Sequence, residues 1–316
     1  MGRGVRKSRQ PMNAAAPAPV ALFAYNRPAH LLRVIRALAA NPESAHSELH
    51  IYSDAARDVR SEAAVAEVRS IIATATAGFA RVVPVLRERN LGLAGSIVDG
   101  VTRLCASHGR VIVVEDDLVV SRHFLRYMNE ALDLYQHEER VISIHAYIYP
   151  VSAPLPETFF LRGADCWGWA TWQRGWNLFD ADGAKLLAQI EQRRLTSDFD
   201  FNGSADYTRM LRDQISGRND SWAVRWYAAA FLEDRLTLYP GRSLVENIGA
   251  DGSGTHTGAT DVFDVRLAEG PVKATRIAIE ENKAARALVE KHFRAIQPST
   301  LRRLRNRARR LLRLEN

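Results

Sequence analysis

Three consecutive acidic residues, Glu115-Asp116-Asp117, have the type and spacing best suited to chemistry in this sequence. They follow Val111–Val114, a β-branched run that is typical of a buried strand. Carboxylates in such a position are costly to bury unless their charge is used. Because Mg²⁺ and Mn²⁺ take oxygen ligands that bridge carboxylate and phosphate, the motif predicts a metal site that neutralises a diphosphate leaving group. An acidic cap at a helix start is the alternative.

A glycine-rich segment, residues 247–256, is the second candidate. Glycines let backbone amides approach phosphate groups closely, and Ser253 or Thr255 can add a hydroxyl donor. His256 can bind a metal or a phosphate through its imidazole. Many glycine-rich segments are only turns. The crowding of Asp, Ser, Thr and His residues into this one favours a phosphate-binding loop.

Asp220, in the run Asn219-Asp220-Ser221-Trp222, is the candidate general base. An attacking hydroxyl must lose its proton, and a carboxylate within hydrogen-bonding reach can accept it. The alternative is that Asp220 caps a helix over Ser221–Leu232, and the two roles are compatible. His145 ends an expected strand near this site, where a structural role is the simpler interpretation.

The six tryptophans all lie within residues 159–226, and four of them lie within Trp167–Trp176. Indole faces pack on the apolar faces of sugars, although burial in the core is the commoner fate of a single tryptophan. We expect three of them to contact an acceptor: Trp167, Trp169 and Trp222.

The elements that would position these residues alternate between strand and helix up to Pro150. The expected strands cover Val20–Tyr25, Leu49–Ser53, Arg81–Leu86, Val111–Val114 and Val141–His145. One expected helix begins at Pro28, and three others cover residues 58–76, 94–107 and 121–136. This alternation predicts an α/β fold with a mostly parallel sheet flanked by helices. Such sheets bind ligands at the carboxyl ends of their strands, where Asp54 and the Glu-Asp-Asp run are expected.

Charge and composition limit the classes of function. The net charge of +7 belongs to the ends, since residues 1–10 carry +4, residues 298–316 carry +6, and the remaining body carries −3. A mildly acidic body does not fit a nucleic-acid-binding core. No apolar run is long enough to span a bilayer. Cys105 and Cys166 form no zinc spacing and no Cys-His signature, which favours a reducing cytoplasm and gives them no catalytic role.

The two ends of the chain differ in character. Residues 1–17 are expected to form a disordered leader and lack the apolar region of a signal peptide. Ser299–Asn316 predicts a basic amphipathic helix, which fits either an anionic membrane surface or docking on its own domain. Between them we expect a donor-binding half over 18–150 and an acceptor-binding, catalytic half over 151–265. A helical extension over 266–316, with one helix at 274–293, follows.

These residues together resemble the GT-A (Rossmann-like) glycosyltransferases, and most closely a bacterial form of the N-acetylglucosaminyltransferase I type. The resemblance runs in order through residues 18–258. The matching segments are Ala24-Tyr25-Asn26-Arg27, Tyr52-Ser53-Asp54, Val113-Val114-Glu115-Asp116-Asp117-Leu118, Cys166-Trp167-Gly168-Trp169, Asp220-Ser221-Trp222 and Thr255-His256. Asn26 and Ser221 stand where the family has acidic residues.

The resemblance implies a role for each matched residue. Four roles concern the donor: Arg27 meets the nucleotide, Asp54 reads uracil, Asp116 lies near the ribose, and Asp117 binds Mn²⁺ or Mg²⁺. Three more concern phosphate and acceptor: Thr255 and His256 meet phosphate, and Asp220 is the base.

The implied activity is an inverting, metal-dependent transfer of a sugar, from a UDP-sugar or another nucleotide diphosphate-sugar, to an acceptor hydroxyl. The expected acceptor is a glycan or glycolipid in surface polysaccharide synthesis, and the expected setting is the cytoplasm with peripheral contact at the inner membrane face.

Three other interpretations stay open. A nucleotidyltransferase acting on sugar phosphates would normally carry a glycine-rich basic loop where this chain has Tyr25-Asn26-Arg27-Pro28. A dehydrogenase is less favoured still, because no Gly-x-Gly-x-x-Gly follows the first strand. A non-catalytic carbohydrate- or membrane-binding protein on the same fold is opposed by the joint presence of four polar residues: Asp54, Asp117, Asp220 and His256.

Overall fold

The computed structural model describes residues 16–74, 78–251 and 260–297. Its centre is an eight-stranded sheet in the order β3-β2-β1-β4-β8-β6-β9-β7. The strands are β1 Val20–Ala24, β2 Glu48–Ser53, β3 Arg81–Leu86, β4 Arg110–Glu115, β6 Val141–His145, β7 Thr158–Arg162, β8 Trp169–Trp172 and β9 Leu236–Pro240. All but β7 and β8 run in one direction. The predicted α/β fold with a mostly parallel sheet is therefore confirmed.

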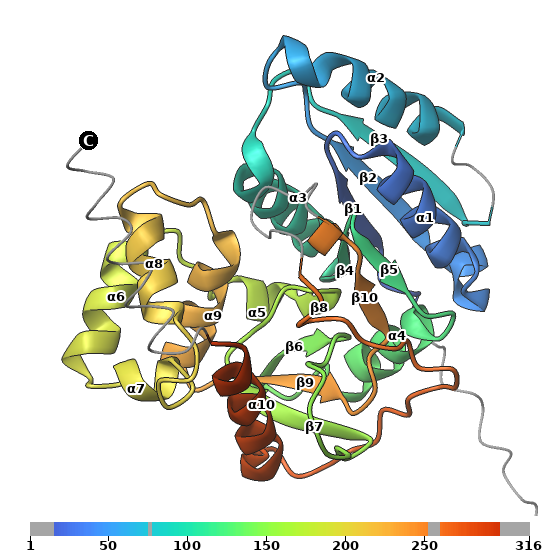
Figure 1. The fold of residues 1–316 in the computed structure, drawn as a ribbon. Coiled ribbons are helices and arrows are strands. Elements are labelled where there is room, and N and C mark those ends of the chain that lie inside the picture. The colour runs from blue at the N-terminus through green and yellow to red at the C-terminus, as the bar shows by residue number, and fades with distance from the viewer. Residues whose placement is uncertain (1–15, 75–77, 252–259, 298–316) are drawn as a thin grey trace, which may run out of the picture.

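Helices cover both faces of this sheet (Figure 1). Helices α1 Pro28–Ala39, α2 Val59–Thr74 and α4 Phe124–Leu134 pack on one face, and α3 Gly92–His108 packs on the other. The alternation along β1 explains this, because Leu22 joins the core under α1 while Phe23 joins the core under α3. Gly109, at φ 75°, ends α3 in the left-handed conformation that favours glycine and turns the chain into β4.

A second, two-stranded sheet pairs β5 Leu118–Val120 with β10 Val245–Asn247. The backbone N–H of Ile248 extends this pairing by donating to the carbonyl oxygen of Asp117 at 2.8 Å. The start of the glycine-rich segment is thereby tied to the residues that follow β4, although more than 120 positions separate them in the chain.

The part of the chain after β8 forms a helical lobe beside the sheet (Figure 1). Its helices are α6 Gly183–Gln192, α7 Thr196–Phe199, α8 Tyr207–Ile215 and α9 Trp222–Leu232, whereas the short α5 Gln173–Trp176 packs on the sheet beside α3. Tryptophans fill the space between α9 and the sheet, where the ring of Trp169 lies 5.5 Å from that of Trp222 and 6.0 Å from that of Trp226. The lobe and the sheet thus share one aromatic core.

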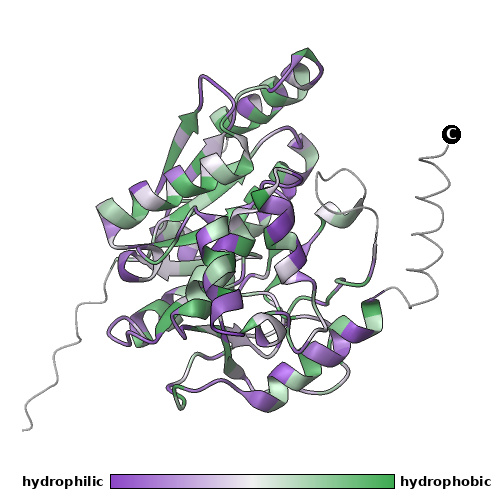
Figure 2. Cartoon of the chain, turned by 90° about the vertical axis from the view of Figure 1, so that its left-hand side faces the viewer, coloured by the Kyte–Doolittle hydropathy of each residue, from purple (hydrophilic) through white to green (hydrophobic). Residues whose placement is uncertain are grey.

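The helix predicted over 274–293 is wrong in its first half, because α10 covers Lys283–Ile296. The side chain of Asn282 accepts the Ala285 N–H and caps the helix at that point. The preceding residues are held extended by tertiary contacts: the Thr275 carbonyl accepts the Tyr135 hydroxyl, and the Asn282 N–H donates to the Phe160 carbonyl. Hydrophobic and hydrophilic residues mix along α10, the helix at the lower right of Figure 2.

Other sequence predictions fall outside the described residues or remain predictions. The leader before residue 16 and the basic helix after residue 297 belong to the first group. The division into two halves at residue 150 remains a prediction, and one continuous sheet takes strands from both sides of that residue. None of the helices in the described ranges has the length and apolar character needed to cross a membrane.

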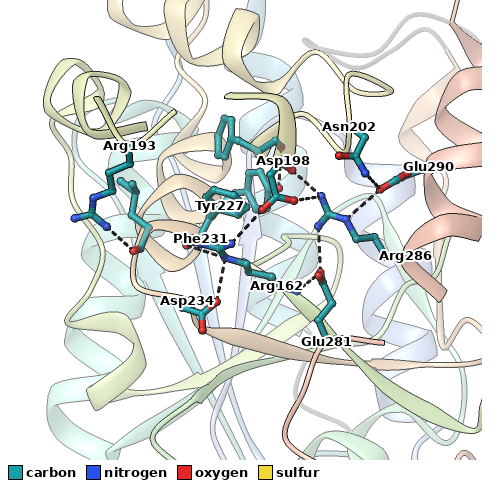
Figure 3. Close-up of polar contacts among 12 residues, drawn as sticks. Arg162, Arg193, Asp198, Asn202, Tyr227, Phe231, Asp234, Glu281, Arg286 and Glu290 are labelled. Atoms are coloured by element: carbon teal, nitrogen blue, oxygen red, sulfur yellow. Dashed lines mark hydrogen bonds and ion pairs between the residues drawn. The ribbon is translucent and has the colours of Figure 1, made fainter. Parts of the chain in front are cut away.

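A buried ion-pair network attaches α10 to the helical lobe (Figure 3). The Arg286 side chain, only 7% exposed, lies 2.6 Å from a carboxylate oxygen of Asp198 and 3.1 Å from oxygens of Glu281 and Glu290. Asp198 also pairs with Arg162 at 3.1 Å, so its carboxylate lies between two guanidinium groups.

We expect Arg286→Ala to lower the free energy of unfolding by about 3–5 kcal/mol, because it leaves partly buried carboxylates without their cation. Chemical denaturation measures the change. Arg294→Ala is the matched control: Arg294 also pairs with Glu290, at 3.3 Å, but its side chain is 56% exposed, and the expected loss is about 0–1 kcal/mol. Equal losses in the two variants would contradict a network that stabilises through burial.

Candidate active site

A cleft of about 740 Å³ opens at the carboxyl ends of β1, β2 and β4, as predicted for ligand sites of parallel sheets. One wall holds residues that follow these strands, and the other holds residues of α8 and of the segment leading into α9. The cleft brings together most of the predicted site residues: Arg27, Asp54, Asp116, Asp117, Trp167, Asp220 and Trp222.

The Glu-Asp-Asp run meets Arg27 at the end of β1. The Arg27 guanidinium pairs with Asp116 and lies 3.0 Å from an oxygen of Asp117. The second carboxylate oxygen of Asp116 accepts the Tyr25 backbone N–H at 3.1 Å. Asp116, 4% exposed, is therefore fully engaged, while Asp117, 17% exposed, keeps carboxylate surface toward the cleft.

Burial raises the pKa of two acids in this cluster. Desolvation raises the pKa of Asp116 to about 6, against the lowering effect of Arg27. Burial, followed by the charges of Asp117 and Asp116, raises the pKa of Glu115 well above its ordinary value. Within the described ranges, a single guanidinium, that of Arg27, thus faces three adjacent acids.

The whole cleft shows the same imbalance. Among the residues that the structure describes, three arginines line it: Arg27, Arg57 and Arg209. Eight acidic residues line it: Asp54, Glu115, Asp116, Asp117, Asp165, Asp206, Asp213 and Asp220. Arg218 and Arg225 pair with two of these acids, Asp213 and Asp220, from outside the lining, and the remaining acidic surface favours a cation beside any anionic ligand. All-oxygen donors suit a hard divalent cation, so the residues present fit Mn²⁺ or Mg²⁺.

Gly249 leaves room at the Asp117 carboxylate. A Cβ on this glycine would lie 2.3 Å from the Asp117 side-chain oxygen and 3.0 Å from the Arg27 guanidinium. Its N–H donates to the Asn247 side chain at 2.8 Å, which fixes the turn. The glycine-rich segment therefore begins against the proposed metal ligand. Thr255 and His256 lie outside the described residues, and their phosphate-binding roles stay predictions.

Asp54 is already bound to backbone amides. Its carboxylate accepts the N–H groups of Ala55 at 3.0 Å, Leu91 at 2.9 and 3.1 Å, and Gly92 at 2.9 Å. These contacts hold the turn that begins α3, where the helix dipole also favours negative charge. Asp54 thus shapes the cleft wall at the N-terminus of α3, and its predicted contact with a base remains untested.

Asp220 does not cap α9, because Ser221 does so: the Ser221 hydroxyl oxygen accepts the Val224 N–H at 3.2 Å. The Asp220 side chain is 68% exposed and lies 3.6 Å from the anchored Arg225 guanidinium. One of its oxygens lies 3.8 Å from where a Cβ of Gly92 would be. Its carboxylate is therefore presented to the cleft, close to the same glycine that Asp54 binds.

The three predicted acceptor tryptophans have different surroundings. Trp167 lines the cleft and is partly buried, with its ring 4.8 Å from that of Tyr147. Trp222 lines the cleft but is 3% exposed. Trp169 is fully buried in β8 and is not among the lining residues. Its β-strand alternation turns it into the aromatic core, so it has no place in the acceptor contacts proposed below.

Sequence reasoning missed two residues of the cleft. The Asp165 carboxylate accepts the hydroxyl of Tyr149 at 2.9 Å and that of Tyr239 at 3.3 Å. Arg209, on α8, is one of the three lining arginines. Asp165 lies two positions before Trp167, the only sequence signal that could have drawn attention to it. No sequence signal pointed to Arg209, because only the packing of the helical lobe brings α8 to the cleft.

His145 and the cysteines show no sign of catalysis. His145 is fully buried, and its Nε2 accepts the Trp167 N–H at 3.1 Å. Burial raises the pKa of Cys105 to about 12 and raises that of Cys166 well above its ordinary value. Both thiols stay protonated near neutral pH and are poor nucleophiles.

Comparison with known proteins gives structural neighbours at low similarity. No family model matches the sequence, and no curated protein is significantly similar to it. A mannosyltransferase from Pyrobaculum calidifontis, solved with GDP-Man and Mn²⁺, is 14% identical over 45% of this chain and 39% of its own, with a TM-score of 0.31. Glucosyl-3-phosphoglycerate synthase from Mycobacterium tuberculosis, solved with Mn²⁺, UDP and glucosyl-3-phosphoglycerate, is 16% identical over 52% of this chain and 59% of its own, with a TM-score of 0.33. The chain thus matches less than two thirds of the length of either glycosyltransferase.

Proposed function

We propose that this chain is a metal-dependent, inverting glycosyltransferase that moves a sugar from a nucleotide diphosphate-sugar, with UDP-sugars favoured, to an acceptor hydroxyl. One observation carries the proposal: a buried, cation-poor carboxylate cluster at Asp117 and an exposed carboxylate at Asp220 line a single cleft. The first suits a phosphorylated donor with its metal, and the second suits proton removal from an acceptor.

On the donor side, Asp117 would hold the divalent cation, which when bound supplies positive charge to the diphosphate. Asp116 fixes the Arg27 guanidinium, so that it faces the same region. Gly249 keeps the approach to Asp117 open. Asp54 would lie at the nucleoside end of the donor, and Thr255 and His256 would contact its phosphates.

On the acceptor side, Asp220 accepts the proton of the attacking hydroxyl. The hydroxyl oxygen forms a bond to the anomeric carbon while the bond from that carbon to the diphosphate oxygen breaks, and the nucleoside diphosphate leaves. The acceptor lies against Trp167 and the small part of Trp222 that lines the cleft, near Arg209 of α8. The acceptor would be a glycan or glycolipid in surface polysaccharide synthesis. The basic tail would bring the enzyme to it at the inner face of a membrane.

The experiment is a binding and hydrolysis screen of the purified chain with UDP-, GDP-, dTDP- and CMP-sugars. One set contains Mn²⁺ and a matched set contains a chelator. We expect one donor to bind and to release its nucleoside diphosphate only with the metal, because the acidic surface of the cleft favours a cation beside the diphosphate. A folded protein that binds none of them would instead favour the non-catalytic carbohydrate-binding interpretation. In a separate incubation with a nucleoside triphosphate and a sugar phosphate, release of pyrophosphate would favour a nucleotidyltransferase.

A further inference from the structure

A second group of metal-ligating side chains lies at the opposite end of the sheet from the cleft. Glu48 begins β2, and His50 follows two positions later, so both side chains leave the strand on one face. His108 is the last residue of α3 and reaches the same place. Asp54 borders the cleft at the far end of this strand, roughly 20 Å away at about 3.3 Å per residue. The group is therefore separate from the proposed donor site.

The three ligand atoms are close enough for one ion. Glu48 Oε2 lies 3.1 Å from His50 Nε2 and 3.7 Å from His108 Nε2, and all three atoms lie within 4.8 Å of one another. Ligands about 2.0–2.2 Å from a tetrahedral Zn²⁺ are separated from each other by about 3.4 Å. Small side-chain rotations bring the observed spacing to this value.

The histidines are also prepared for binding. The Ser107 hydroxyl is hydrogen-bonded to His108 Nδ1 at 2.7 Å, which leaves Nε2 directed at Glu48. A partner on the second ring nitrogen is the usual support of a metal-binding histidine, since it fixes the tautomer and the ring orientation. His50 is buried, and its Nε2 lies 3.1 Å from Glu48 Oε2, so packing holds this ring nitrogen beside the carboxylate.

We propose that Glu48, His50 and His108 form a binding site for a divalent transition-metal ion of the Zn²⁺ type, with water completing the coordination. Two imidazoles and one carboxylate suit Zn²⁺, Co²⁺ or Ni²⁺ better than Mg²⁺, which prefers oxygen ligands alone. The ion would join the start of β2 to the end of α3. It would stabilise the folded chain in proportion to its concentration and take no part in sugar transfer.

Arg81 competes with the ion. Its guanidinium donates to Glu48 Oε2 at 2.6 Å, and the side chain is 59% exposed. Ion binding would require this side chain to turn into solvent. Removing the guanidinium should therefore strengthen binding, whereas removing an imidazole should weaken it. These opposite directions separate a metal site from an ordinary surface ion pair.

The test is calorimetric titration of the full chain with Zn²⁺, repeated with Ni²⁺. We expect the wild type to show an ion-binding step whose affinity falls at least tenfold in His108→Gln and rises in Arg81→Gln. His137→Gln, which removes an exposed histidine outside the three-residue group, should match the wild type. Any ion bound in the donor cleft appears equally in all four proteins.

Thermal unfolding gives a second readout that does not depend on transferase activity. Added Zn²⁺ should raise the Tm of the wild type and of Arg81→Gln by several degrees, and should raise that of His108→Gln less. Identical isotherms and identical Tm shifts in the wild type and His108→Gln would show that the cluster is only a surface ion pair. The donor screen measures release of a nucleoside diphosphate and does not depend on this site. Failure of the Zn²⁺ proposal would therefore leave the proposed function unaffected.

Discussion

Asp220→Asn is expected to lower kcat for sugar transfer about 10²–10⁴-fold, because the amide cannot accept the proton of the acceptor hydroxyl. Donor binding should be unchanged, since Asp220 lies outside the cluster around Asp117 and Arg27. The fold should also be unchanged, because Ser221 rather than Asp220 caps α9. Steady-state kinetics with saturating donor and acceptor, together with nucleotide titration, measure the two effects separately.

The matched control is Glu233→Gln, which makes the same change of charge at the opposite end of α9, on an exposed side chain. Its kcat should equal that of the wild type. If Asp220→Asn retained wild-type kcat, the base would have to be another carboxylate of the cleft. Asp165 would be the next candidate, although two tyrosine hydroxyls already bind it.

Asp117→Asn is expected to reduce kcat/KM about 10²–10³-fold, because a bound metal contributes several kcal/mol and 1.36 kcal/mol corresponds to a tenfold change in rate. The Mn²⁺ concentration for half-maximal activity should rise, which distinguishes a lost metal ligand from general damage. Arg27 keeps its pair with Asp116 in this variant, so the local structure should persist. Titration with Mn²⁺ at fixed donor measures the shift.

Glu130→Gln is the control for this second variant, because it neutralises an exposed carboxylate on α4, away from the cleft. It should show wild-type Mn²⁺ dependence. An unchanged Mn²⁺ dependence in Asp117→Asn would place the metal elsewhere in the cleft or remove it from the proposal. The two variants together therefore test the two halves of the proposed chemistry independently, since one should change kcat alone and the other the response to metal.

The local sequence was sufficient for the five strands expected before Pro150 and for the motifs that end them, but not for the antiparallel strands β7 and β8. Short β-branched runs such as Val111–Val114 indicate buried strands, and parallel strands end at one edge. The approach of Asp54 to the Glu-Asp-Asp run was therefore predictable from their positions in the chain. The shortened α10 was not, because helix propensity over 274–282 yields to hydrogen bonds with Tyr135 and Phe160.

The sequence by itself determined which carboxylates follow buried strands and hence where a cation could be held. Only the tertiary structure decided which side chains are free to react. Asp54 and Asp220 look alike in sequence. The Asp54 carboxylate accepts backbone N–H groups, whereas the Asp220 carboxylate does not cap α9, because Ser221 does so. Trp167 and Trp169 are two positions apart, yet one lines the cleft and the other lies in the core. The physical reason is that hydrogen bonding and burial depend on neighbours that are distant in the chain.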